Sequence, residues 1–163
     1  MTDVRAPIYA ALSALGIDYE LFEHPPVFTA EEAALHWAAI PGAAVKNLFL
    51  RNKKGDRHYL VILGIEKQAD LRQLVKVIGD DRLSFGSPER LQRYLGVTPG
   101  SVSPFGLIHD TSRSVRVIVD SDLKQAARLI FHPNDNTASV TISGADFARF
   151  LEQQGNSVRW VKL

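Results

Sequence analysis

The sequence contains no cysteine among its 163 residues. This absence excludes disulfide bonds, thiolate metal sites and cysteine nucleophiles, and it is compatible with a reducing compartment. Long apolar runs are also missing, since no stretch approaches the roughly 20 residues that cross a bilayer. The N-terminus lacks the basic start and apolar stretch of a signal peptide. From these absences we expect a cytoplasmic protein without membrane contact.

An excess of charge of one sign is likewise missing. The 19 Lys and Arg residues nearly balance 18 Asp and Glu residues, which leaves a formal net charge of +1. The protein is therefore no general binder of polyanions, and any contact with nucleic acid must be local and only weakly salt-dependent. The candidate patch surrounds one predicted turn and comprises Arg51, Lys53, Lys54, Arg57 and His58. The alternative is a solvated hairpin tip.

Several catalytic motifs are absent as well. The five histidines form no H-x-H or H-E-x-x-H pattern, so we expect no metal site and no cofactor. No G-x-S-x-G elbow and no phosphate-binding G-x-x-x-x-G-K-[ST] loop occurs. These absences argue against covalent serine catalysis and against nucleoside triphosphate hydrolysis.

The length and the 45% hydrophobic content suit one globular domain that spans residues 1–163. Apolar periodicity and capping signals predict helices over 8–15, after Thr29, after Asp70, after Ser87 and over 145–154. Strands are predicted over 19–23, 45–51, 57–63, 115–119, 128–131, 138–142 and 158–161. The two strands around Gly55 should form a hairpin. The pattern predicts an α/β fold with a mixed, largely antiparallel, barrel-like sheet surrounded by helices.

Three polar segments, residues 44–50, 98–107 and 131–137, interrupt this pattern and suggest a single site. Lys46 and Asn47 stand at the start of an otherwise apolar strand, which would hold them at the rim of the sheet. A lysine there can meet a phosphate or a carbonyl oxygen. The alternative is an edge lysine that discourages aggregation.

The other two segments are ambiguous by themselves. Gly100 and Pro104 frame a loop whose backbone N–H groups can point at a developing oxyanion, although most such stretches are ordinary turns. His132 precedes a proline, and it can act as a general base, donate a hydrogen bond to substrate or serve as a turn residue.

In this order and spacing, these segments resemble the YbaK/ProX family of aminoacyl-tRNA deacylases, which is related to the editing domain inserted in many bacterial prolyl-tRNA synthetases. The resemblance covers nearly the whole chain and is strongest to the free-standing branch that clears alanine from proline tRNA. It is carried by His24-Pro25-Pro26 with Phe28-Thr29, by Val45-Lys46-Asn47-Leu48-Phe49-Leu50, by Gly100 to Pro104 with Phe105-Gly106-Leu107, and by Phe131-His132-Pro133-Asn134-Asp135-Asn136-Thr137.

The resemblance implies trans-editing, in which the enzyme hydrolyses the ester between alanine and the terminal ribose of proline tRNA. Lys46, Gly100 and Pro104 are the implied catalytic residues: Lys46 engages the terminal phosphate or nearby substrate oxygens, and the Gly100–Pro104 loop positions the carbonyl and ribose. Ser103 and Asn47 would bind substrate. His132 is a pocket residue, since a tRNA hydroxyl can help orient the attacking water. The implied partners are the acceptor end of proline tRNA and prolyl-tRNA synthetase.

Selection of alanine over proline is a problem of size, because a pocket rejects a larger side chain by steric clash. We expect its walls to be Phe28, Thr29, Phe49 and His132; the alternatives are core packing for the two phenylalanines and helix capping for Thr29. Two rival functions stay open. One is a deacylase of cysteinyl-tRNA(Pro) or of another small amino acid, and the other is a non-catalytic module that binds tRNA or a synthetase.

Overall fold

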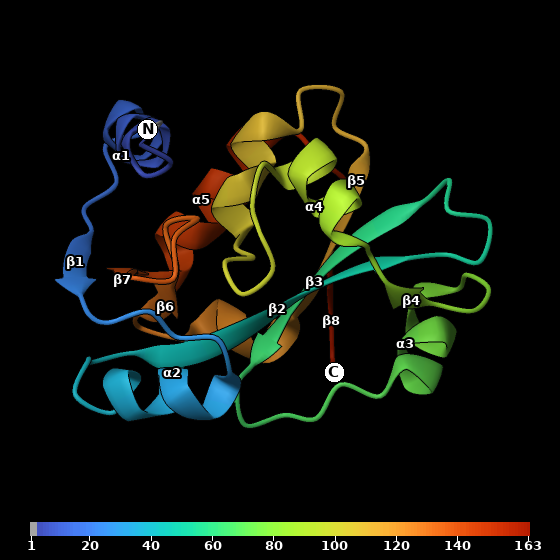
Figure 1. The fold of residues 1–163 in the computed structure, drawn as a ribbon, viewed down its shortest axis with the longest axis horizontal. Helices are drawn as coiled ribbons and strands as arrows, with labels where there is room; N and C mark the ends of the chain where they lie inside the picture. Colours follow the sequence, from blue (N-terminus) through green and yellow to red (C-terminus); the bar gives the residue numbers. More distant parts are fainter. Residues whose placement is uncertain (1–2) are drawn as a thin grey trace.

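The computed structural model describes residues 3–163, which form one mixed sheet with helices packed around it (Figure 1). The strands are β1 Glu20–Glu23, β2 Ala43–Arg51, β3 His58–Gly64, β4 Ser84–Phe85, β5 Val115–Asp120, β6 Leu129–Phe131, β7 Ala138–Ile142 and β8 Val158–Val161. The α-helices are α1 Ala6–Ala14, α2 Ala30–Trp37, α3 Leu71–Ile78, α4 Pro88–Leu95 and α5 Gly144–Gln154, and two 3-10 helices are η1 Pro104–His109 and η2 Ser121–Gln125. Predicted elements recur within one or two residues of their expected bounds, while β4, η1 and η2 were not predicted.

The hairpin of β2 and β3 is confirmed. The two strands pair antiparallel from Val45 opposite Gly64 to Arg51 opposite His58. The side-chain Oδ1 of Asn52 accepts hydrogen bonds from three backbone N–H groups of the connecting loop. Gly55 supplies the positive φ, 77°, that this loop requires.

Strand order is β1-β7-β6-β2-β3-β5-β8, with β4 attached to β2. Four of the pairings are antiparallel and three are parallel, which confirms the mixed sheet of the predicted α/β fold. On the side of β2 that faces away from β3, β6 pairs only at Ala43 and Ala44, and β4 only at Leu50 and Arg51. Within the described chain, the middle of β2 therefore has no strand partner on that side.

Helix termini follow the capping signals of the sequence. The hydroxyl of Thr29 accepts from the backbone N–H of Glu32, and the Glu32 carboxylate accepts from the N–H of Phe28. This reciprocal arrangement starts α2 immediately after Phe28. The side chains of Asp70, Ser87 and Ser143 cap α3, α4 and α5 by accepting a hydrogen bond from a backbone N–H of the first turn.

The main core lies between the sheet and the layer formed by α1, α4, η1 and α5, whereas α3 lies near β4 toward the other end of the molecule (Figure 1). Phe105 of η1 is fully buried and packs edge-to-face against Phe131 and Phe150. Since η1 directly follows the loop at Gly100, this packing holds the loop on the core. No helix within residues 3–163 has the length and apolar character needed to cross a membrane.

Candidate active site

A cavity of about 190 Å³ opens at the middle of β2, which lacks a strand partner on the side away from β3 in the described chain. This volume is below the roughly 300–1,000 Å³ of pockets for drug-sized ligands, so it suits a small chemical group. Five separate parts of the chain line it, through Val27, Phe28, Thr29, Ala33, Trp37, Val45, Lys46, Asn47, Ile65, Gly100, Val102 and His132. The three polar segments singled out in the sequence thus meet in one place.

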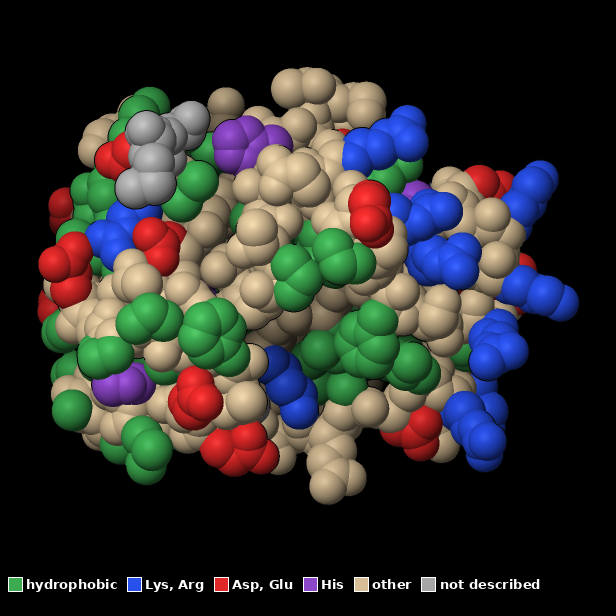
Figure 2. Space-filling view, in the orientation of Figure 1, with side chains coloured by type: hydrophobic (Ala, Val, Ile, Leu, Met, Phe, Trp, Pro, Cys, Tyr) green, Lys and Arg blue, Asp and Glu red, His purple; other side chains and the backbone are tan. Residues whose placement is uncertain are grey.

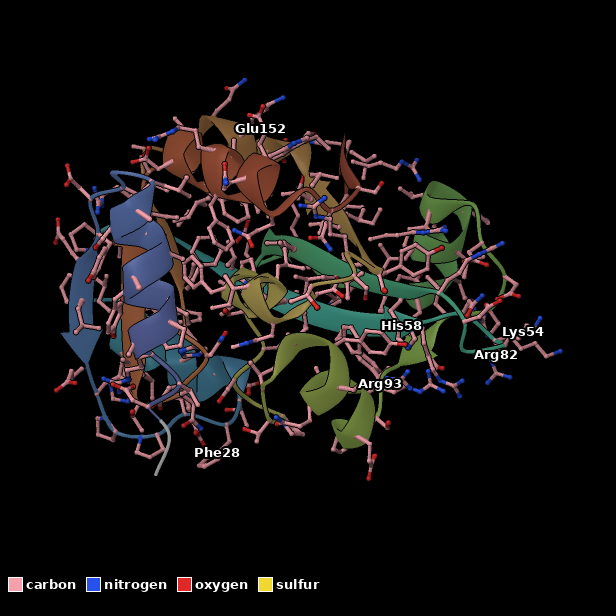
Figure 3. All side chains as sticks on the ribbon, turned by 90° about the horizontal axis from the view of Figure 1, so that it is seen from above. Phe28, Lys54, His58, Arg82, Arg93 and Glu152 are labelled. Carbon is pink, nitrogen blue, oxygen red and sulfur yellow. The ribbon has the colours of Figure 1, made fainter. Side chains whose placement is uncertain are left out.

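Most of the predicted site residues border this cavity. They are Lys46, Asn47, Phe28, Thr29, Gly100 and His132. Phe28 is 71% exposed and projects from the rim (Figure 3), so it forms a lip more than a buried wall. Thr29 borders the cavity and also caps α2.

The expectation that Phe49 forms a pocket wall is wrong. Phe49 is 3% exposed, and its ring packs 5.6 Å from the ring of His58 and 6.2 Å from that of Tyr94, measured between centroids. It shares a strand face with Asn47 but lies two residues further along, roughly 7 Å away at the rise of a β-strand. Its apolar side chain therefore joins the core.

Ser103 and Pro104 also lie apart from the lining. Both are buried, and Pro104 is the first residue of η1. The hydroxyl of Ser103 donates to Oδ1 of Asn134 at 2.8 Å and accepts from the N–H of Phe105 at 3.0 Å. These contacts join the loop at Gly100 to the 131–137 segment, so Ser103 and Pro104 position the loop without touching the cavity.

The same 131–137 segment also holds the rim at Val27. The side-chain amide of Asn136 donates to the carbonyl of Val27 at 2.9 Å, and the N–H of Val27 donates to the carbonyl of Asn136 at 3.2 Å. Gly100, across the cavity mouth, adopts a φ of 89°, which favours glycine and brings bare backbone to the rim. The mouth is thus built from tethered loops.

Lys46 and Asn47 bring unpaired polar groups to the cavity. Lys46 is half-buried and forms no ion pair within 4 Å among residues 3–163. Oδ1 of Asn47 is buried and has no hydrogen-bond partner in the described part of the chain. A buried acceptor without a partner is costly, so this oxygen is available to a ligand that can donate.

His132 presents a second acceptor. Its Nδ1 lies 2.9 Å from the carbonyl oxygen of Ala138, which can only accept, so Nδ1 carries the proton and donates. Burial lowers the pKa of His132 below its usual 6.5, and nearby His24 lowers this pKa further. The ring is therefore neutral at physiological pH, and its Nε2 is left as an acceptor on a residue that lines the cavity.

Trp37 is the largest lining residue that the sequence did not reveal. Its Nε1 donates to the hydroxyl of Ser139 at 2.7 Å, and Nε2 of His24 lies 2.8 Å from the same oxygen. The indole ring also packs 5.4 Å from the His132 ring, measured between centroids. Ala33 and Trp37 are four residues apart on one helix and therefore share a face. This spacing was the sequence signal that could have placed Trp37 beside Ala33 at the cavity.

Within residues 3–163, no cluster of three or more His, Cys, Asp or Glu side chains is arranged to hold a metal ion. The polar groups at the cavity are instead a lysine, an amide and a neutral histidine. This set can hold a carbonyl oxygen, an ammonium group and a water molecule by hydrogen bonds and charge.

Comparison with known proteins agrees with these observations. A sequence model of the aminoacyl-tRNA editing domain matches residues 24–150. This match defines the protein by class as an editing enzyme, an aminoacyl-tRNA deacylase. The chain belongs to the aminoacyl-tRNA editing domain family.

Individual relatives cover almost the entire chain. The prolyl-tRNA editing protein ProX of Acetoanaerobium sticklandii is 40% identical over 161 residues, which are 99% of this chain and 98% of that protein. The multifunctional Ser/Thr-tRNA deacylase ProXp-y of Escherichia coli K12 is 27% identical over 90% of this chain and 87% of its own. The crystal structure of a candidate trans-editing enzyme for prolyl tRNA synthetase superposes with a TM-score of 0.73 at 24% identity, over 100% of this chain and 99% of that one.

Proposed function

We propose that this enzyme removes alanine from mischarged proline tRNA in the cytoplasm, acting in trans on tRNA released by prolyl-tRNA synthetase. The observation that carries the proposal is the small cavity itself, which is lined by Trp37, His132 and Lys46. The 40% identity to a prolyl-tRNA editing protein supports proline tRNA as the substrate.

The amino-acid end of the substrate would enter the cavity. An alanine side chain is a single methyl group, whereas the ring of proline adds volume that the aromatic walls resist by steric clash. The α-ammonium group of the substrate would donate to Nε2 of His132 and to Oδ1 of Asn47, which has no partner among the described residues. The oxygen of Asn47 would thus be satisfied only in the complex.

The chemistry needs no protein nucleophile, since an ester is already an activated acyl group. Lys46 and the backbone N–H at Gly100 would stabilise the negative charge that develops on the carbonyl oxygen as water attacks. The cavity would hold one water molecule in place and shield it from bulk solvent. Most of the rate enhancement would then come from the orientation of this water toward the ester carbonyl. Ser103 and Pro104 would contribute by fixing the loop that carries Gly100.

Serine is the second candidate for the amino acid that is removed. A serine side chain is only one oxygen larger than alanine, and its hydroxyl can donate to the second lone pair of Oδ1 of Asn47, beside the α-ammonium group. The 27% identity to a Ser/Thr-tRNA deacylase gives this candidate independent support.

Single-turnover hydrolysis tests the assignment directly. Proline tRNA charged with alanine, serine, cysteine or proline is mixed with excess enzyme, and the released amino acid is followed against uncatalysed hydrolysis. We expect alanine to be released at least tenfold faster than proline, the discrimination typical of a few apolar atoms in a steric pocket. Release of serine or cysteine faster than alanine would reassign the substrate. No hydrolysis of any of the four aminoacyl-tRNAs, together with tight tRNA binding, would favour a binding module.

The state of His132 predicts the acid limb of the pH profile. Protonation would convert Nε2 from an acceptor to a cationic donor that repels the substrate ammonium and Lys46. Because the pKa of His132 is lowered, activity should persist at pH 6.5 and fall only at more acid pH. Rates of alanine release are measured from pH 8 downward, with the uncatalysed rate subtracted at each pH.

The matched variant is His132→Gln, whose amide cannot titrate. Its kcat/KM should be lower than that of the wild type and should lack the acid limb. An identical acid limb in the variant would show that another group is responsible.

A further inference from the structure

Three arginines gather at the end of β2 that lies beyond the cavity. Arg51 ends β2, and Arg90 and Arg93 lie on α4. A Cβ placed on Gly55 would lie 2.9 Å from nitrogen atoms of both Arg51 and Arg90, so these two guanidinium groups flank the hairpin loop. The guanidinium of Arg93 lies 5.4 Å from the ring centre of Tyr94. We call Arg51, Arg90 and Arg93 the arginine cluster.

Neutral groups orient this cluster. Nη1 of Arg90 lies 2.9 Å from the carbonyl oxygen of Gly55 and 2.8 Å from Nε2 of His58. Because Arg90 can only donate, His58 must accept and is therefore neutral. Burial, followed by the charges of Arg90, Arg51 and Arg93, lowers the pKa of His58 to about 4. His58 thus fixes Arg90 without adding or removing charge.

No carboxylate in the described part of the chain forms an ion pair with the cluster. Among residues 3–163, no ion pair within 4 Å includes any of its three arginines. The nearby carboxylates of the hairpin region have other partners: Asp80 accepts from Arg57, and Asp56 accepts from the side-chain amide of Asn52. Like charges held together repel, so the cluster is suited to an anion supplied from outside.

The cluster lies on the same side of the molecule as the cavity. Asn47 and Arg51 share one face of β2 and are four residues apart, roughly 13 Å at the rise of a strand. Phe28 at the cavity lip and Arg93 both lie along one side, opposite Glu152 of α5 (Figure 3). Lys and Arg side chains also gather over the end of the molecule that carries the β2–β3 hairpin (Figure 2). One nucleic-acid strand can therefore reach both sites.

We propose that the arginine cluster binds backbone phosphates of the tRNA acceptor arm and so delivers the aminoacylated 3′ end to the cavity. The inference rests on the proposed function. Planar guanidinium groups form paired hydrogen bonds with phosphate oxygens, which makes arginine well suited to this contact. A net charge of only +1 means that such a local cluster would carry much of the electrostatic affinity.

The test uses the double variant Arg51→Gln with Arg93→Gln. Arg90 is kept because it bonds to the hairpin loop and to His58. Alanine release is measured with full-length alanyl-tRNA at several salt concentrations and with 3′-alanyl-adenosine, which has no phosphate. For the tRNA we expect KM to rise about tenfold with kcat retained, and the salt slope to shrink by about two. Hydrolysis of alanyl-adenosine should be unchanged.

The matched control is Lys124→Gln with Arg149→Gln, which removes the same charge from η2 and α5. Helix α5 carries Glu152, which lies opposite Phe28 and Arg93 (Figure 3). Urea unfolding checks that both double variants fold. Equal effects of the two double variants, or an unchanged KM and salt slope in the cluster variant, would overturn the proposal. So would a defect that appears only when prolyl-tRNA synthetase is added, since the cluster would then bind the synthetase.

The failure of the proposed function is distinguishable from the failure of this inference. If the wild type hydrolyses no aminoacyl-tRNA, the proposed function fails. Binding of uncharged proline tRNA, followed by fluorescence anisotropy, then still tests the cluster: loss of tRNA affinity in the cluster variant alone supports the phosphate contact, and equal affinity of wild type and cluster variant overturns it.

Discussion

Replacing Lys46 with alanine is expected to lower kcat/KM for alanyl-tRNA by about 100-fold to 1,000-fold, the usual effect of removing one group that stabilises a developing oxyanion. Lys46 borders the cavity and forms no ion pair among the described residues. Its charge is therefore available to a ligand. Single-turnover release of alanine under excess enzyme measures the loss.

The control for this variant is Lys76→Ala, which removes an exposed lysine from α3. Its rate should equal that of the wild type. Because Lys46 is only half-buried, its replacement should leave the urea midpoint of unfolding nearly unchanged. Full activity of Lys46→Ala would remove Lys46 from the mechanism, and activity lost together with stability would assign it a structural role.

Filling the cavity should have an effect of similar size. Ala33 of α2 is 4% exposed and lines the cavity, so Ala33→Leu places three further carbon atoms where the substrate side chain is proposed to bind. A few excess apolar atoms in a steric pocket cost on the order of 10-fold to 200-fold in kcat/KM. We expect alanine release to fall by about 100-fold, measured on alanyl-tRNA.

The neighbouring residue supplies a matched control. Ala34 is exposed on the same helix, so Ala34→Leu adds the same atoms outside the cavity and should keep the wild-type rate. Overpacking can cost about 1–3 kcal/mol, so the free energy of unfolding is measured for both variants. Unimpaired alanine release by a folded Ala33→Leu enzyme would show that the amino acid binds elsewhere.

The local elements were largely predictable because their signals lie close together in sequence. The hairpin depends on Asn52 and Gly55, both within its own loop. The start of α2 depends on Thr29 and Glu32, three residues apart. Such contacts depend little on distant parts of the chain, so residue propensity and spacing are enough to predict them.

The site was predicted in part. Motif resemblance brought Lys46, Gly100 and His132 to attention, and all three line the cavity. Phe49 was misplaced because apolar character cannot distinguish a core position from a pocket wall when both lie on one strand face. Trp37 was missed because its role depends on Ser139, 102 residues away.

The sequence by itself determined the chemical repertoire and the local elements. It contains no cysteine nucleophile, it has almost no net charge, and it carries the polar segments that later meet. Only the tertiary structure decided that, within the described chain, the side of β2 away from β3 lacks a strand partner between β6 and β4, which leaves room for a cavity at Asn47. It also brought α4 beside the hairpin, where Arg90 meets His58. These features depend on contacts between distant segments, and their geometry is set by packing of the entire core, not by any local pattern of residues.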